Sequence, residues 1–512
     1  MAKQESGGRG QLLHAAKTLL LSGVAYVVNY GILLVLTPFI TRNIGAEAYG
    51  FVTLAKEFSQ YAAILTMALN TYAARYIGLA YHKNDIHGAN VYFASVFWGN
   101  VVLSTVILGG ILVFIHFMDS ILVVSPELLH DVRLLFFYTF VSFGVTTVFS
   151  VFGCAGYISN RMDLVGLFKT ASYVVKALVL VAAYALFPPR AWYVALGILA
   201  AALLVGTADF GICRKFLPEM SVSRRYFSFR AVKELLLNGF WASFNMVGEI
   251  LNNGLDLLIC NQMLTNLEMG QLAIAKTMQT IMQGVYYIVN QTFIPRFLKS
   301  YASDAPGTVI RELKLAMKVS GMLANVVFAG FVAFGLTFYK LWIPEQDSQV
   351  IYLLTVITFL TSIASGPMQP LYYIYTLTLR QKLPCVITII GGLLNVAGMF
   401  ILIKYVGMGV YAVAWTTVAV MFVINFVTNP LYMARCLHVP SGTFYPDILR
   451  NALSCGVLTL LFRAFAGIAA PEGWLSLILC AAACAAVGAP LHLLIVCNGE
   501  QRQGLRSLIR RK

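Results

Sequence analysis

Stretches of about 20 predominantly apolar residues recur from one end of this chain to the other. A transmembrane helix needs about 20 such residues, because it must satisfy its own backbone hydrogen bonds across a hydrocarbon core roughly 30 Å thick. The stretches are too long for barrel strands and lack the alternation of apolar and polar residues that such strands show. We therefore predict about fourteen membrane-spanning helices, over residues 19–41, 48–74, 90–116, 129–157, 164–187, 190–213, 237–264, 268–294, 315–340, 350–378, 383–404, 408–433, 448–468 and 474–497.

The composition excludes the two other broad classes of protein. Hydrophobic residues make up 59% of the 512 residues, charged residues make up 11%, and the mean hydropathy is +0.78. Soluble domains carry about 25% charged residues, so this chain could not cover the surface of a water-soluble globule. Disorder needs low hydrophobicity and high charge, and the chain has the opposite. The predicted fold class is an all-α polytopic membrane protein.

The distribution of basic residues predicts the orientation in the membrane. Most of the 36 lysines and arginines lie in every second connection, starting with the N-terminal segment. Because cytoplasmic loops carry the excess of these residues, both termini are predicted to be cytoplasmic. The net charge of +15 is then a sign of topology, with anionic membrane lipids as the partner of the basic clusters and no nucleic acid expected.

The sequence predicts no cofactor or metal site. The segment Gly407–Ala412 fits the dinucleotide pattern G-x-G-x-x-A, but it lies between two apolar spans with no strand before it, so we interpret it as a tight turn between helices. The nine cysteines form no C-x-x-C pair, the histidines form no H-E-x-x-H, and there is no Walker A sequence. We expect no cofactor, no metal and no enzymatic activity, and any energy source must lie outside ATP hydrolysis by this chain.

The chain repeats itself at a spacing of about 220 residues. Gly50–Lys56 (Gly-Phe-Val-Thr-Leu-Ala-Lys) matches Gly270–Lys276 (Gly-Gln-Leu-Ala-Ile-Ala-Lys), and Asn70 falls on Asn290. Two copies of six spans each enter the membrane from the same side, which gives a parallel repeat about an axis along the membrane normal. The predicted organisation is a cytoplasmic tail 1–18, an N-lobe 19–213, a basic linker 214–236, a C-lobe 237–434, two extra helices within 435–497 and a basic tail 498–512.

Polar side chains follow one face of several predicted spans. The span 237–264 carries Asn238, Asn245, Glu249, Asn252, Asn253 and Asp256, and the span 268–294 carries Lys276, Gln279, Gln283, Tyr287 and Asn290. Asn29, Lys56, Gln60, Asn70 and Lys176 occupy spans of the N-lobe. Polar groups in spans usually face protein or water, so one interpretation is a water-filled cavity between two lobes, as in transporters. The alternative is that the amides join helices by hydrogen bonds.

The segment between the first two spans carries a family resemblance. It reads Pro38-Phe-Ile-Thr-Arg42-Asn-Ile-Gly45-Ala-Glu-Ala-Tyr49-Gly50. It resembles the start of Wzx-type polysaccharide and oligosaccharide flippases, the polysaccharide biosynthesis protein family of the multidrug/oligosaccharidyl-lipid/polysaccharide exporter superfamily. Their pattern is an apolar helix followed by R-x-L-G-x-x-x-Y-G, with Ile44 here in place of Leu. The family's glycine near Ala68 is missing, whereas the fourteen spans in a 6+6+2 layout extend the resemblance over nearly the whole chain.

This resemblance implies a transport function. Such flippases move an undecaprenyl-pyrophosphate-linked oligosaccharide from the inner to the outer leaflet of the bacterial cell membrane by alternating access, for cell-surface polysaccharide biosynthesis. The polar headgroup cannot cross hydrocarbon unaided, so it needs a polar cavity. Polysaccharide polymerases and glycosyltransferases are the implied protein partners.

The candidate site residues divide into three groups by charge. Lys56, Lys176 and Lys276 are expected to offset the pyrophosphate charge, and Arg75 and Arg296 to attract the headgroup at the inner mouth. The amides expected to bind sugar hydroxyls are those of Asn29, Gln60, Asn70, Asn245, Asn252, Gln279, Gln283 and Asn290. Glu249 and Asp256 are candidates for coupling to H⁺ or Na⁺.

Three other functions stay open at this point. A flippase for the lipid-linked peptidoglycan precursor would use the same chemistry on another headgroup. A multidrug or cation antiporter of the same superfamily tends to have twelve spans and an acidic cavity. A membrane glycosyltransferase or polymerase needs a large outer loop, and the longest one here covers only about 117–128.

Overall fold

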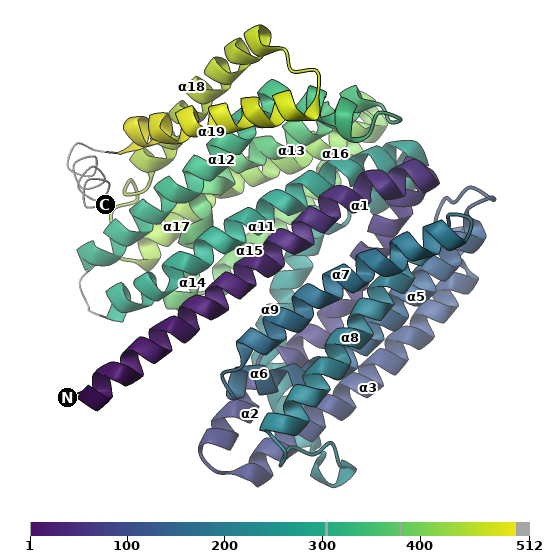
Figure 1. Cartoon of the computed structure of the whole chain (residues 1–512), viewed down its shortest axis with the longest axis vertical. Coiled ribbons are helices and arrows are strands. Elements are labelled where there is room, and N and C mark those ends of the chain that lie inside the picture. The colour runs from purple at the N-terminus through teal and green to yellow at the C-terminus, as the bar shows by residue number, and fades with distance from the viewer. Residues whose placement is uncertain (1, 303–305, 379, 498–512) are drawn as a thin grey trace. The chain divides into compact units, whose positions relative to one another are not determined.

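The computed structural model describes residues 2–302, 306–378 and 380–497, with side chains from residue 26 onward apart from those of 288, 289, 295, 302 and 306. Within these ranges all regular secondary structure is helical (Figure 1). The predicted basic tail 498–512 lies outside the described residues.

The chain divides into two compact units. The first unit comprises Met1–Ile250 and Leu257–Gly270, and the second comprises Leu251–Asp256 and Gln271–Lys512. This division does not test the lobe and tail boundaries expected from the sequence, which remain predictions.

The first unit contains the helices of the first half of the chain. They are α1 (Ala2–Asn70), α2 (Ala73–His82), α3 (Ile86–His116), α4 (Met118–Ile121), α5 (Leu129–Phe149), η1 (Ser150–Gly153), α6 (Cys154–Ile158), α7 (Met162–Leu186), α8 (Tyr193–Phe216), η2 (Arg224–Tyr226), α9 (Phe229–Glu249) and most of α10 (Asp256–Met263). Helices α3, α5, α8 and α7 pack side by side in that order, and α1 packs against α7, α5 and α9.

The second unit contains the remaining helices. They are η3 (Ile250–Gly254) beyond its first residue, α11 (Asn266–Ala302) beyond Gly270, α12 (Pro306–Trp342), α13 (Ser348–Met368), η4 (Gln369–Tyr372), α14 (Tyr373–Leu377), α15 (Lys382–Ile401), η5 (Leu402–Val406), α16 (Val410–Val423), η6 (Ile424–Thr428), α17 (Asn429–Cys436), α18 (Tyr445–Ala469) and α19 (Trp474–Val496). Helix α12 packs against α13, α18 and α19.

Eleven helices of the described residues are long and apolar enough to cross a membrane. The difference from fourteen has a physical explanation. The first two predicted spans form a single helical stretch, Tyr26–His82, because the turn between them is very short. The predicted spans 237–264 and 268–294 carry the densest polar stripes, which lower their mean hydropathy. The prediction of an all-α polytopic membrane protein is confirmed.

The turn between the two halves of α1 depends on Gly45. This residue has φ 81° and ψ 169°, and it separates two helical segments. That region of backbone conformation is open essentially to glycine alone, so any side chain here would strain the turn. The buried hydroxyl of Tyr49 then shares a hydrogen bond of 3.2 Å with that of Thr37, which joins the two arms.

The same segment packs against the start of α11 inside the first unit. A Cβ on Gly50 would lie 3.1 Å from the backbone of Gly270. The two segments can approach this closely because neither residue has a side chain. The Glu47 carboxylate accepts hydrogen bonds from Ser125 and from Asn266. The sequence motif that carries the family resemblance therefore builds a turn and a helix contact.

The first unit has an apolar interior at the inner end expected for its spans. Phe93, Ile77 and Leu235 are fully buried in one cluster that joins α3, α2 and α9. Each side chain of this size that is buried away from water contributes about 1.5–3 kcal/mol to stability. Helix α9 is thereby packed onto the helices of the first unit.

In the described part of the chain, three π-helical segments interrupt the spans that follow α8. They are η3, η5 and η6, which continue α9, α15 and α16. A π-helical turn leaves backbone carbonyls without the regular α-helical partner, and such turns frequently mark functional sites. The first of them contains Asn252 and Asn253 of the predicted polar stripe.

Candidate functional site

Two lysines of the first unit come together without a counterion in ion-pair range. Lys56 lies on the second half of α1 and is exposed, and Lys176 lies on α7, which packs against α1, and is partly buried. Their charges are close enough to act on one another. Within the described part of the chain, neither ammonium has a hydrogen bond or ion pair. The Glu57 carboxylate, next to Lys56 in the sequence, also acts on the Lys56 charge without an ion pair to it. Two cations and one nearby carboxylate leave a net positive charge inside the spans, which makes this a candidate site for an anion.

Two further predicted binding residues lie on α1. Gln60 is exposed one helical turn after Lys56, and Asn29 is partly buried on the first half of the helix. Neither side-chain amide forms a hydrogen bond with another described residue. Both amides are therefore available to bind hydroxyl groups of a ligand.

The Asn70 amide is used inside the protein instead. Its Nδ2 donates to the Oδ1 of Asn100 at 2.9 Å, Asn100 donates back at 2.9 Å, and Ser150 donates to the Oδ1 of Asn70 at 3.1 Å. This is the interhelical hydrogen bonding that the sequence left open as the alternative.

Lys276 and Asp256 form an ion pair in the second unit. The Lys276 Nζ lies 3.1 Å from the Asp256 Oδ2, and it also donates to the main-chain carbonyl of Asn253. The two charged side chains are 13% and 9% exposed, respectively. The sequence placed these residues in different roles, a cation for the substrate and a carboxylate for an ion, and the structure brings them together.

Asn252 lies at the centre of a buried amide network. Its Nδ2 donates to the Thr388 carbonyl at 2.6 Å, and its own carbonyl accepts from Asn395 at 2.8 Å. Asn395 also shares hydrogen bonds of 3.3 Å with Thr417. Asn252 and Asn395 are both fully buried. The network joins the π-helical segment η3 to α15 and α16.

The remaining predicted residues lie along α9 and α11. Asn245 donates to the Glu249 carboxylate at 3.0 Å, one turn further along α9. Gln279 and Asn290 are partly buried on α11, and Gln283 is exposed. Arg296 is exposed near the end of α11, with its guanidinium 5.8 Å from the centre of the Phe293 ring. Their roles in binding remain predictions.

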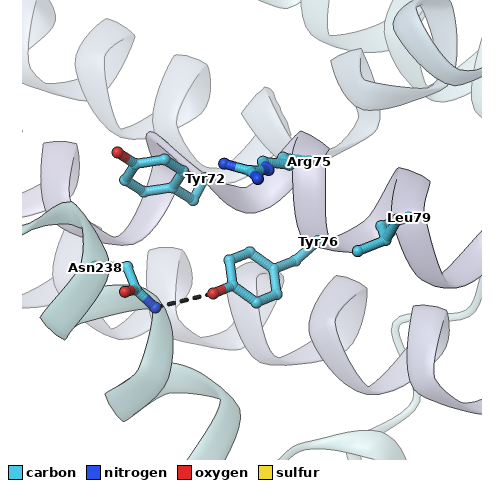
Figure 2. A pocket seen from close by; sticks show the side chains of 5 residues that line it. All are labelled: Tyr72, Arg75, Tyr76, Leu79 and Asn238. Atoms are coloured by element: carbon cyan, nitrogen blue, oxygen red, sulfur yellow. Dashed lines mark hydrogen bonds between the residues drawn. The ribbon is translucent and has the colours of Figure 1, made fainter. Parts of the chain in front are cut away.

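Arg75 lines a pocket in the first unit. The pocket has a volume of about 280 Å³, and Figure 2 shows the side chains that line it. They are Tyr72, Arg75, Tyr76 and Leu79 from α2 and the residue before it, and Asn238 from α9. The Asn238 Nδ2 donates to the Tyr76 hydroxyl at 2.9 Å across the pocket (Figure 2).

A seam of contacts with neighbouring helices continues from this pocket along α9. The Glu234 carboxylate accepts from the Tyr92 hydroxyl at 3.0 Å, and Ser243 donates to the Ile64 carbonyl at 2.8 Å. Between them, a Cβ on Gly239 would lie only 1.9 Å from the Ala68 carbonyl oxygen. At about 100° per residue, positions 234 and 238 lie on one side of α9 and positions 239 and 243 on the adjacent side, so about half of the helix circumference meets α1, α2 and α3.

A second buried charge cluster lies outside the set predicted from the sequence. The Asp447 carboxylate on α18 is within 3.4 Å of the Lys314 ammonium and 3.6 Å of the Lys318 ammonium on α12. Lys318 is only 2% exposed. The spacing of Lys314 and Lys318 by one helical turn was a signal of a shared partner, but only the fold identifies that partner.

His492 on α19 extends this region. Its ring shares hydrogen bonds with Ser454 at 2.9 Å and with Asn325 at 3.4 Å, and Asn325 also donates to the Asn451 carbonyl at 2.8 Å. All four side chains are fully buried. A single histidine in an apolar span has no sequence pattern that could have indicated this network.

The arrangement provides binding groups, and the described residues include no cluster of three or more histidine, cysteine or acidic side chains placed to hold a metal ion. A lysine pair without an ion pair, amides without hydrogen-bond partners among the described residues and a buried ion pair on polytopic helices are features of a membrane transporter.

Solved structures of transporters share this fold. One is the lipid II flippase MurJ in an inward closed conformation, with a TM-score of 0.66 and 14% identity, covering 94% of this chain and 99% of that one. Another is a multidrug resistance MATE family transporter of the MOP superfamily in an inward-facing conformation, with a TM-score of 0.60 and 13% identity, covering 80% of this chain and 94% of that one. The fold is therefore that of membrane transporters and flippases.

The family follows from the sequence match. The model of the polysaccharide biosynthesis protein family matches residues 15–301, and the chain belongs to this family. A relative from Bacillus subtilis (strain 168), described as uncharacterized membrane protein EpsK, is 26% identical over 480 residues, which are 94% of this chain and 95% of the relative. The resemblance seen in the motif at 38–50 is confirmed.

Proposed function

We propose that this protein is a flippase that moves an undecaprenyl-diphosphate-linked oligosaccharide from the inner to the outer leaflet of the bacterial cell membrane. The family and the transporter fold support the class of function. The observation that carries the choice of substrate is the pair Lys56 and Lys176, which has no counterion in ion-pair range among the described residues. Both termini are cytoplasmic in this proposal, in keeping with the distribution of basic residues.

The lysine pair suits a diphosphate for an energetic reason. A net positive charge inside a membrane span is costly, so two cations with one nearby carboxylate are stabilised by an added anion during the transport cycle. A diphosphate brings its negative charges on neighbouring phosphates, which two adjacent ammonium groups can share. Lysine is a common phosphate ligand, acting as a point charge. The prenyl chain stays in the lipid while the headgroup crosses.

The uncommitted amides suit the sugar part of the headgroup. Asn29, Gln60, Gln279 and Gln283 have no hydrogen-bond partner among the described side chains and main chain. Each amide offers both donors and an acceptor, which matches the mixed character of a hydroxyl group. Asn70 and Asn252 hold helices together, so we assign them an indirect role through helix position.

The driving force is proposed to involve Glu249 and Asp256. Lys276 engages Asp256 through Oδ2, so an H⁺ or Na⁺ that uses this oxygen needs a state in which the lysine has moved away. Glu249 has Asn245 as its neighbour on the same helix. Consumption of the sugar by polymerases and glycosyltransferases at the outer face is the other source of direction.

The test is a translocation assay with lysine variants. We expect Lys56→Met and Lys176→Met each to lower the rate of headgroup translocation by about tenfold or more, since each removes a charge-assisted contact to phosphate. Lys83→Met, in the exposed turn after α2, is the matched control and keeps the rate of the natural protein. Unchanged translocation in both lysine variants would refute the proposal.

The peptidoglycan precursor is the second candidate cargo, because the MurJ structure, described as a lipid II flippase, aligns over 94% of this chain. Mass spectrometry of lipid-linked intermediates in depleted cells separates the two cargoes. An accumulated oligosaccharide on the inner face supports the proposal, and accumulated peptidoglycan precursor favours the second candidate. Unchanged intermediates point to the antiporter function instead.

A further inference from the structure

The pocket of the first unit has one wall that belongs to α9. Tyr72, Arg75, Tyr76 and Leu79 are spaced so that they lie on one face of a helix, and Asn238 faces them (Figure 2). This end of α2 is the one expected at the cytoplasmic side. The pocket is therefore reached by a headgroup before it enters the membrane interior.

The lining groups are available for a ligand. Arg75 is exposed, and its guanidinium has no ion pair or hydrogen bond within the described ranges. The same holds for the Tyr72 hydroxyl. A guanidinium binds phosphate in a two-pronged geometry, and aromatic rings with a few polar groups are the usual lining of an organic ligand site.

The volume limits what the pocket can hold. Sites that enclose a whole small molecule measure about 300–1,000 Å³. At about 280 Å³, this pocket suits one part of a larger ligand, such as a single sugar with its phosphate. An oligosaccharide would extend beyond it.

Occupancy of the pocket competes with one of the contacts that hold α9 in place. The Asn238 amide reaches the Tyr76 hydroxyl at 2.9 Å, and the neighbouring contacts of Gly239 and Ser243 close the seam with α1. A ligand that bonds to either group replaces this hydrogen bond. Loss of the bond removes the polar contact that holds this part of α9 to α2.

We propose that this pocket is a docking subsite for the sugar–phosphate part of the lipid-linked substrate, and that binding there loosens the seam of α9 with α1 and α2. Arg75 binds the phosphate, Tyr72 covers the sugar, and Asn238 exchanges the Tyr76 hydroxyl for the ligand. This inference rests on the proposed function, and it adds a recognition step before the lysine pair.

The first experiment measures translocation kinetics with the full-length protein in phosphatidylcholine vesicles. The probe is a short-chain prenyl diphosphate carrying a disaccharide. We expect Arg75→Ala to raise the apparent KM by about tenfold or more with little change in kcat, because the docking contact is lost and the transport site is intact. Arg75→Lys recovers only part of the affinity, since lysine lacks the planar fork. Arg225→Ala, another exposed arginine expected at this membrane side, is the matched control.

The second experiment follows α9 by disulfide cross-linking between Ile64→Cys and Ser243→Cys, whose native residues are in contact. The background replaces Cys480, which is the one cysteine of nine that is not buried. We expect the sugar-bearing probe to lower the cross-linking yield, and Tyr76→Phe to lower it without any probe. A yield that the probe leaves unchanged contradicts the loosening of this seam.

The outcomes separate the two levels of the proposal. If the natural protein does not translocate the probe at all, the proposed function fails. If it does, and Arg75→Ala matches Arg225→Ala in KM, the docking subsite fails alone. If the Arg75→Ala defect appears only when phosphatidylglycerol is added to the vesicles, the pocket binds a lipid headgroup and the inference is overturned. Farnesyl diphosphate, which has no sugar, should compete with the probe in the natural protein and compete less well in Arg75→Ala, which assigns the phosphate contact to Arg75.

Discussion

The Lys276 ammonium is bound to two oxygens that a transported cation would also seek. One belongs to the Asp256 carboxylate and the other to the Asn253 carbonyl in the π-helical segment η3. Unwound backbone carbonyls and a carboxylate are typical ligands of coupling ions in transporters. The lysine thus supplies a tethered positive charge at this place, and its release is the step that would expose the oxygens.

Removal of this lysine should destabilise the protein more than removal of the whole pair. We expect Lys276→Met to lower the free energy of unfolding by about 3–5 kcal/mol, because Asp256 is then left buried and uncompensated. The double variant Lys276→Met with Asp256→Asn should recover much of the loss. Thermal unfolding of the purified protein in detergent, arranged as a double-mutant cycle, measures the coupling. Additive effects would show that the two side chains act independently.

For single residues, the sequence indicated which polar side chains lie inside spans, but it did not indicate which partners they contact. Lys276 and Asp256 were both found from their position on polar stripes, yet their contact depends on how two helices rotate against each other. Asn70 and Asn252 looked like cavity residues and proved to be bonded to Asn100 and Thr388. An amide on a stripe has the same sequence signature whether it faces water or a neighbouring helix.

At the scale of helices, the positions of the spans followed from apolar length, and their ends did not. Helix α12 covers Pro306–Trp342 where hydropathy indicated 315–340, and α11 covers Asn266–Ala302 where it indicated 268–294. A helix continues beyond the apolar core as long as its residues favour helix, and hydropathy does not report this. The π-helical segments also have no signal in hydrophobic periodicity.

Helices α18 and α19 are fixed to α12 by a buried polar network. We expect His492→Ala to cost about 1–3 kcal/mol and to speed amide exchange in α18 and α19, because Ser454 and Asn325 lose a buried partner. Cys480→Ala on the same helix is the matched control, since its side chain forms no hydrogen bond with described residues. Hydrogen–deuterium exchange in detergent provides the measurement. Equal exchange in the two variants would mean that apolar packing alone holds these helices.

At the scale of the whole molecule, the proposed topology assigns each loop to a membrane side. We expect reporters in the loop between α8 and α9 and at the C-terminus to be cytoplasmic, and one between α12 and α13 to be outside. The reason is that lysine and arginine concentrate in the first two places. Fusions to alkaline phosphatase and to a fluorescent protein read the two sides in opposite ways. A C-terminus found outside would require an odd number of spans.

The family and the fold class could be predicted because they depend on features of consecutive residues. These features are the number of apolar stretches, the motif at 38–50 and the internal repeat, and each can be found in the sequence alone. The pocket with Tyr72 and Asn238 could not be predicted in this way, since Tyr76 and Asn238 on its two walls are 162 residues apart in the chain and meet only in the packed unit.

The hairpin at Gly45 has a consequence for how cargo selection can change. Its residues make a turn, join two arms and pack against the start of α11, and none of these contacts involves the lysine pair or the pocket. The segment 38–50, by which the family is most easily recognised, thus shares none of these contacts with the residues proposed to bind the glycan. Substrate specificity can therefore change between relatives, by evolution or by protein engineering, without any change in the turn at Gly45.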